Sequence, residues 1–315
     1  MAAGWLILAA LAQADTLLPT PAQQRQARPD GSQIAYYLLQ RTEARSAKAL
    51  LLIIQGSDCN SVTRIPSVYR HLAQAMPEAD VLTVEKYGLD ARLPYSNEAE
   101  RADCPASYLK HDSPSQRVED LLAVIGQLRK SHAYTRIVAL GGSEGAVIAH
   151  ALAARSNWID ATVAFNGGGQ WFLDDLLHSV AVSPLSAAQK SESRASLLAF
   201  TRQVRDQPPE GLQVSGHGAR WWQEVLRLDQ LALLQATRTP ALIIQSAADE
   251  SVSVLAVTSM ISKLRQAGRP GLAFHFYPGL DHRLMDADGR SRMADAVQDI
   301  ASWLRQLQAP EREPG

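Results

Sequence analysis

The chain has 315 residues, with 31 Lys and Arg against 32 Asp and Glu, so its formal net charge is −1. Apolar residues make up 46 % and charged residues 20 %, which is typical of a globular protein and excludes a largely disordered chain. The balanced charge disfavours nucleic-acid binding through a broad basic surface. The 2 cysteines and 8 histidines form neither a C-x-x-C nor an H-E-x-x-H motif, so we expect no metal site.

The N-terminus predicts export. Residues 2–12 form an apolar run, and residues 12–14 have the small-x-small pattern of a signal-peptidase site before Asp15. Eleven residues are too few to span a bilayer, which takes about 20. No Lys or Arg precedes Arg25, and the alternative is an N-terminal helix of a cytoplasmic protein. We expect a signal peptide at 1–14, a periplasmic or secreted mature protein, and no stable membrane insertion, because no other apolar segment approaches 18 residues.

Strand and helix patterns alternate along most of the chain. The run A-L-L-L-I-I-Q at 49–55 is apolar throughout, as expected for a strand that is covered on both faces. A polar stretch at 87–115 has no regular pattern. Strands are expected at 34–39, 49–55, 81–85, 136–140, 161–165, 241–245 and 272–277, and helices at 66–75, 116–129, 144–154, 252–266 and 291–306.

This alternation predicts an α/β fold with a doubly wound, mostly parallel sheet and helices on both faces. Residues 171–239 interrupt it with helical pieces separated by Pro and Gly, so we expect a helical cap inserted between core segments 15–170 and 240–308, with a flexible tail at 309–315. Trp171, Trp221 and Trp222 are candidates for an apolar wall of a substrate site. The alternative for each tryptophan is the core of the cap.

Cys59 and Cys104 each follow a predicted strand, 49–55 and 81–85 respectively. If these strands are parallel neighbours, their following loops lie at the same edge of the sheet and the two thiols could meet. The bridge would close 104 − 59 = 45 residues and contribute on the order of 3–4 kcal/mol. A disulfide is expected only in an exported protein.

The segment Gly141-Gly142-Ser143-Glu144-Gly145 lies between a predicted strand and a predicted helix. A turn this sharp strains the serine and brings the flanking backbones close together, so small residues are needed two positions before and after it. A phosphate-binding loop is disfavoured, because no G-K-[ST] follows and Glu144 would repel the ligand. Ser143 is therefore a candidate nucleophile.

A serine nucleophile needs a base and an orienting acid. Of the eight histidines, His282 alone follows directly on the last predicted strand, at the edge where parallel sheets place functional groups. Asp249 follows strand 241–245 at the same edge and is the favoured acid. The alternatives that remain are Glu250, Asp281, and the pair Asp174 and Asp175.

Two backbone N–H groups are candidates for binding an oxyanion. One belongs to Glu144, directly after the serine, and the other to Ser57, in the loop after the strand at 49–55. Gly56 fits this role because a Cβ atom there could block the approach of substrate. The alternative is an ordinary glycine turn.

These motifs resemble the α/β-hydrolase superfamily over about residues 34–306, in the chain order serine, acid, histidine. The resemblance implies a sheet of about eight strands with a cap inserted after the sixth. Gln55 stands before Gly56 where many lipases have histidine. The Ser-Glu-Gly turn and the R-W-W segment at 220–222 look more like bacterial acyl-thioesterase, dienelactone-hydrolase and peptidase-like branches.

The sequence therefore predicts a cofactor-independent serine hydrolase that cleaves ester or thioester bonds through an acyl-enzyme. The alternatives are a peptidase of the same fold, a carbon–carbon bond hydrolase or haloperoxidase-like enzyme with the same triad, and a non-catalytic binding module. The expected partner is a small-molecule ester, thioester or peptide substrate, with no nucleic acid.

Overall fold

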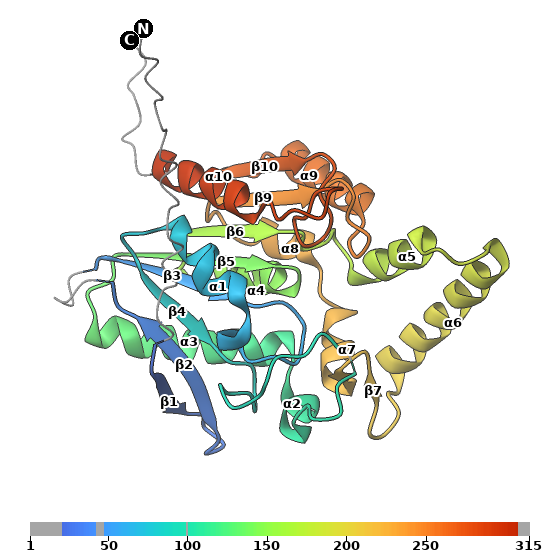
Figure 1. The fold of residues 1–315 in the computed structure, drawn as a ribbon, viewed down its shortest axis with the longest axis horizontal. Coiled ribbons are helices and arrows are strands. Elements are labelled where there is room, and N and C mark those ends of the chain that lie inside the picture. Colours follow the sequence, from blue (N-terminus) through green and yellow to red (C-terminus); the bar gives the residue numbers. More distant parts are fainter. Residues whose placement is uncertain (1–20, 42–46, 99, 308–315) are drawn as a thin grey trace, which may run out of the picture.

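The computed structural model describes residues 21–41, 47–98 and 100–307, so the predicted signal peptide (1–14) and tail (309–315) lie outside the described residues. An eight-stranded sheet forms its centre, in the order β1-β2-β4-β3-β5-β6-β9-β10 (Figure 1). Strand β2 is antiparallel to both its neighbours and every other pairing is parallel. This confirms the predicted doubly wound, mostly parallel sheet. The strands of this sheet are β1 (Gln23–Ala27), β2 (Gln33–Leu39), β3 (Ala49–Ile54), β4 (Asp80–Val84), β5 (Arg136–Gly142), β6 (Ala161–Phe165), β9 (Ala241–Ser246) and β10 (Leu272–Tyr277).

The central strands are apolar on both faces because helices cover both faces of the sheet. Along β3, Leu51 and Ile53 point into one core, while Leu50, Leu52 and Ile54 point into the other. Burial of two apolar faces explains why this strand reads as a continuous hydrophobic run. The helices of the sheet region are α1 (Pro66–Arg70), α2 (Ala106–His111), α3 (Pro114–Ser131), α4 (Glu144–Arg155), α9 (Val254–Gln266) and α10 (Met293–Gln306), with 3-10 helices at Val62–Arg64 and Leu72–Ala75.

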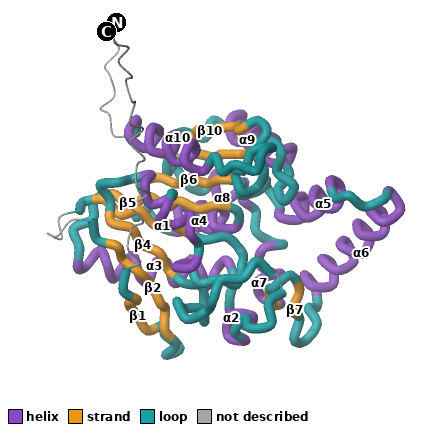
Figure 2. The backbone as a smooth tube through the Cα atoms, in the orientation of Figure 1, coloured by secondary structure: helices purple, strands orange, loops and turns teal. Residues whose placement is uncertain are grey.

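Residues between β6 and β9 form a mainly helical insertion. Helices α5 and α6 lie beyond the sheet, on the side where β6 ends, and α7 returns toward α2 and α3 (Figure 2). An aromatic cluster that includes Phe172, Phe200, Trp221 and Trp222 holds these helices together. The elements of the insertion are α5 (Phe172–Val182), α6 (Ala187–Asp206), β7 (Gln213–Val214), β8 (His217–Gly218), α7 (Ala219–Val225) and α8 (Gln230–Gln235).

Three local predictions need correction. Strand β1 was not expected, since Q-Q-R-Q-A has no apolar alternation and forms a strand only by pairing with β2 at the edge of the sheet. Helix α2 lies in the stretch predicted to be irregular, where Tyr108 is buried. The helix expected at 66–75 divides at His71 into α1 and a 3-10 helix. In the described part of the chain, no helix is long and apolar enough to cross a membrane.

Candidate active site

Ser143 occupies the turn between β5 and α4 with φ 54° and ψ −129°, a backbone conformation that residues other than glycine rarely adopt. The flanking glycines make this turn possible. A Cβ atom on Gly141 would lie 2.2 Å from the carbonyl oxygen of Gly145, and one on Gly145 would lie 2.2 Å from the carbonyl oxygen of Ile54. The turn has the geometry that the G-x-S-x-G spacing predicts.

His282 and Asp249 meet at the end of the sheet beside this turn. The His282 Nδ1 atom lies 3.0 and 2.9 Å from the two carboxylate oxygens of Asp249. Asp249 is buried, and its Oδ1 also accepts hydrogen bonds of 2.8 Å from the backbone N–H groups of Ser251 and Val252. The carboxylate is thus fixed in the orientation that holds the imidazole ring.

The other candidate acids have different partners. Glu250 is exposed. Asp281 accepts hydrogen bonds from the backbone N–H groups of Arg283 and Met285. Asp175 is buried and accepts a hydrogen bond of 2.9 Å from the Ser253 N–H, and burial raises its pKa to about 7. Asp249 is therefore the carboxylate that contacts His282.

A cavity of about 340 Å³ adjoins these residues. Ser143 and His282 both line it, as do Ser57 and Glu144, whose N–H groups are the candidate oxyanion donors. Among the described residues no direct hydrogen bond joins the Ser143 hydroxyl to His282. Such bonds are often long in a free enzyme and shorten when substrate binds. The rest of the wall is largely apolar and includes Val147, Phe172, Leu176, Val225 and Val252.

The residues predicted to line the substrate site need partial correction. Trp221 lines the cavity, but Trp171, Trp222 and Gly56 are not among the described residues that form its wall. Trp171 is exposed, and Trp222 belongs to the aromatic core of the insertion, where its Nε1 donates to the Val214 carbonyl at 3.0 Å. Gly56 lies next to the serine turn, since a Cβ atom there would lie 3.5 Å from the Cβ of Ser143.

Asn166 is a site residue that sequence reasoning missed. It follows β6, is fully buried and has φ 50°. Its Nδ2 donates to the backbone carbonyl of His282 at 2.9 Å, and its Oδ1 accepts from the Ser246 N–H at 2.8 Å. One side chain therefore joins the end of β9 to the loop that carries the histidine. A polar amide at the end of a strand, before three glycines, was the available signal.

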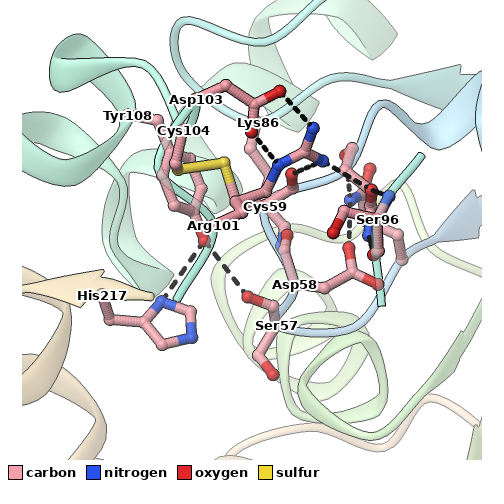
Figure 3. The surroundings of a disulfide bond; sticks show 12 residues. Ser57, Asp58, Cys59, Lys86, Ser96, Arg101, Asp103, Cys104, Tyr108 and His217 are labelled. Atoms are coloured by element: carbon pink, nitrogen blue, oxygen red, sulfur yellow. Dashed lines mark hydrogen bonds and ion pairs between the residues drawn. A yellow bond between two sulfur atoms is a disulfide. The ribbon is translucent and has the colours of Figure 1, made fainter. Parts of the chain in front are cut away.

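The loop after β3 is anchored by a disulfide between Cys59 and Cys104 (Figure 3). Strands β3 and β4 are parallel neighbours, as the disulfide hypothesis required. The Cα atoms of the two cysteines are 6.1 Å apart, within the range that disulfides span. The bridge ties the segment that follows Ser57 to the long connection between β4 and α3.

The sheet topology and the serine turn together identify the chain as a serine hydrolase of the α/β-hydrolase superfamily, as the sequence predicted. More narrowly, it belongs to the prolyl oligopeptidase family, because the model of that family matches residues 106–310. A search of curated proteins finds no match.

Solved structures of esterases and peptidases share this fold. Est1E from Butyrivibrio proteoclasticus superimposes with a TM-score of 0.57 at 14 % identity, covering 91 % of this chain and 99 % of that one. The acylaminoacyl peptidase of Pyrococcus horikoshii gives 0.57 at 13 % identity, covering 95 % of this chain and 43 % of that one. A puromycin-hydrolyzing peptidase of Mycobacterium tuberculosis gives 0.61 at 16 % identity, covering 95 % and 41 %.

Proposed function

We propose that this protein hydrolyses carboxylic esters or thioesters through a Ser143–His282–Asp249 triad and an acyl-enzyme. The observation that carries the proposal is one cavity wall that contains both the strained Ser143 and the His282 ring, whose Nδ1 is held by Asp249. A strained serine next to an oriented imidazole is the arrangement that makes a hydroxyl nucleophilic at neutral pH.

The steps follow from this geometry. The Ser143 Oγ attacks the substrate carbonyl carbon while its proton passes to His282 Nε2, and Asp249 stabilises the imidazolium through Nδ1. The N–H groups of Glu144 and Ser57 bind the negatively charged oxygen. The bond to the leaving group then breaks, and His282 returns the proton to that group. Water repeats the sequence at the acyl carbon and releases the acid.

The cavity favours a small acyl or aromatic group over an extended peptide. The apolar side chains of its wall can bury such a group. Phe172, Leu176 and Trp221, all from the insertion, supply part of this wall, so we propose that residues 171–239 act as a cap over the site. Peptide hydrolysis is the second candidate, favoured by the match to the prolyl oligopeptidase family.

We also propose that the mature protein is periplasmic or secreted. The Cys59–Cys104 disulfide supports this location, because disulfides persist in oxidising compartments. Fractionation of cells followed by N-terminal sequencing tests it. A mature chain that begins near Asp15 is expected, and an uncleaved chain in the cytoplasm would contradict the proposal.

Covalent labelling with a fluorophosphonate probe tests the function. We expect modification at Ser143 alone, and Ser143→Ala should lose labelling and lower kcat by about 10⁴–10⁶-fold. Asp249→Asn should lower kcat by about 10⁴-fold because the imidazole loses its orienting acceptor. The matched control is Glu250→Gln, which alters the exposed neighbouring carboxylate and should leave kcat unchanged.

A panel of nitrophenyl esters, acyl thioesters and peptide amides on the same preparation distinguishes the substrate classes. Faster hydrolysis of esters and thioesters than of peptides is expected. Preferential peptide hydrolysis would establish the second candidate, and an unlabelled, inactive wild type would favour a binding module.

A further inference from the structure

In the loop 55–59, which carries the Ser57 N–H, the carbonyl groups of all residues except Gly56 accept hydrogen bonds from side chains that do not line the cavity. The Arg117 Nη2 donates to the Gln55 carbonyl at 2.7 Å. The Tyr108 hydroxyl donates to the Ser57 carbonyl at 3.1 Å (Figure 3). Next along the chain, Lys86 Nζ donates to the Asp58 carbonyl and Arg101 Nη1 donates to the Cys59 carbonyl at 2.9 Å.

These contacts limit the motion of the peptide unit that carries the Ser57 N–H. That N–H belongs to the peptide between residues 56 and 57. The peptide before it is fixed through the Gln55 carbonyl, and the peptide after it is fixed through the Ser57 carbonyl. The two hydrogen bonds hold both ends of this planar unit in place, so its remaining motion is rotation about the line between its two Cα atoms. A donor that is already oriented needs no reorganisation when the oxyanion forms.

Arg117 also contacts the side chain of Glu144, whose N–H is the second candidate donor. Its Nη1 lies 3.3 Å from the Oε2 of Glu144, the residue whose N–H follows the nucleophile. Neither of these two buried atoms has a hydrogen-bond partner among the described residues, so the ion pair is their main polar contact. The other carboxylate oxygen of Glu144 accepts a hydrogen bond of 2.9 Å from Trp221 Nε1. One guanidinium thus connects the loop after β3 to the first residue of α4.

The charges of this region are consistent with an ionised Glu144. Burial by itself raises the pKa of Glu144, but the positive charges of Arg117 and Lys86 outweigh it and hold the pKa below its ordinary value. Asp112, also buried beside these groups, has its pKa raised by burial to about 7. Burial lowers the pKa of His217 to about 3, so this ring is neutral where it stacks on Trp221 at 3.7 Å.

We propose that Arg117 is a positioning residue that couples the two halves of the oxyanion hole, with Tyr108 fixing the loop half. The proposal rests on the proposed function, because it concerns how the two candidate oxyanion donors are held. Arginine suits this position because its planar fork can donate to a carbonyl and pair with a carboxylate at once, whereas the lysine ammonium acts as a single point charge.

The test compares Arg117→Lys with Arg28→Lys. Arg28 is a matched control because its buried guanidinium also joins a carboxylate, that of Asp120 at 2.7 Å, to a carbonyl, that of Gln33 at 2.7 Å, and none of these residues lines the cavity. With a nitrophenyl ester, Arg117→Lys should lower kcat by about 10–100-fold, since displacing a reacting group by about 1 Å costs up to about 10²-fold. The KM should change little, and Arg28→Lys should keep the wild-type kcat.

A second readout separates positioning from general loss of stability. Phenylboronic acid forms a tetrahedral adduct with an active serine, so its inhibition constant should rise in Arg117→Lys by about the same factor as kcat falls. Unchanged kcat and boronate affinity, or a raised KM alone, would overturn the proposal.

If Arg117→Lys does not fold, the Tyr108→Phe variant tests the proposal instead. This substitution removes the hydroxyl that donates to the Ser57 carbonyl and also lies 3.3 Å from the Nδ1 of His217. Its control is Tyr69→Phe, which removes a buried hydroxyl that contacts Thr83 at 2.8 Å. A kcat lowered about 3–10-fold in Tyr108→Phe alone is expected for one lost hydrogen bond, and equal kcat values would contradict the proposal. Failure of the probe to label the wild type would remove the proposed function itself, whereas labelling at Ser143 with an unchanged kcat in Arg117→Lys would overturn only this inference.

Discussion

Gly145→Ala tests whether the close contact of α4 with the end of β3 is needed for both stability and activity. The added Cβ would lie 2.2 Å from the Ile54 carbonyl oxygen and 2.8 Å from that of Gln55. An ordinary contact is about 3.4 Å, so the backbone must move by about 1 Å. Ala gains about 0.5–1 kcal/mol over Gly within a helix, but forcing a methyl group into a packed site costs about 1–3 kcal/mol or more.

We therefore expect Gly145→Ala to lower the free energy of unfolding by about 1–3 kcal/mol, as measured by urea denaturation. The kcat of the folded variant should also fall, by up to about 10²-fold. Gln55 lies two residues before Ser57, and displacing a reacting group by about 1 Å has a cost of that size.

Gly126→Ala in α3 is the matched control for this substitution. Its Cβ would lie 3.3 Å from the edge of the Trp158 ring, a side chain that can adjust. This variant should retain the wild-type kcat and lie within about 1 kcal/mol of wild-type stability. Equal stability and equal kcat for the two alanine variants would refute the reasoning, because the contact with the Ile54 carbonyl would then be unimportant.

The remaining predictions concern the supports of the site. Asn166→Ala should lower the free energy of unfolding by about 2–4 kcal/mol and lower kcat, because it removes buried hydrogen bonds and leaves alanine at φ 50°. Calorimetry measures the stability and ester kinetics measure kcat, and wild-type values of both would contradict the prediction. The double variant Cys59→Ser, Cys104→Ser should lose about 3–4 kcal/mol, as expected for a closed loop of 45 residues, and an unchanged melting temperature would show that the bridge adds nothing. Burial holds a proton on Asp175 in the folded state up to a pKa of about 7, against an ordinary value of 3.8, so its contribution to stability falls as pH rises from about 4 to about 7. Asp175→Asn should make the measured fall shallower in urea titrations, with the remainder coming from Asp112, whose pKa burial also raises to about 7. The exposed Asp174→Asn should retain the full fall, and identical pH profiles for the two variants would exclude the effect.

The alternating pattern of strands and helices was enough to predict most of the sheet. Apart from the three corrections, the predicted boundaries fall within two residues of the observed ones, because strands covered on both faces must be apolar throughout and the helices above them must carry an apolar stripe. Edge strand β1 escaped prediction for the opposite reason. Its polar sequence is stabilised by pairing with β2 and not by burial of its own side chains.

The three catalytic candidates were also accessible from sequence, because each lies where a parallel strand ends and such ends share one edge of the sheet. Their chain order and the small residues around Ser143 added to this signal. The lining of the cavity was not accessible in the same way. Trp221 and Trp222 are adjacent in sequence, yet only Trp221 faces the site, since neighbouring residues of a helix point in different directions.

The amino-acid sequence by itself determined the fold class, the sharp serine turn and the edge of the sheet where chemistry is expected, because these depend on local periodicity and on steric limits within a few residues. Only the tertiary structure decided that Arg117, Lys86 and Tyr108 gather behind the loop after β3. Buried charges have no local pattern. Their cost in free energy is offset by partners far away in the chain, and those partners become visible only when the helices and loops have packed together.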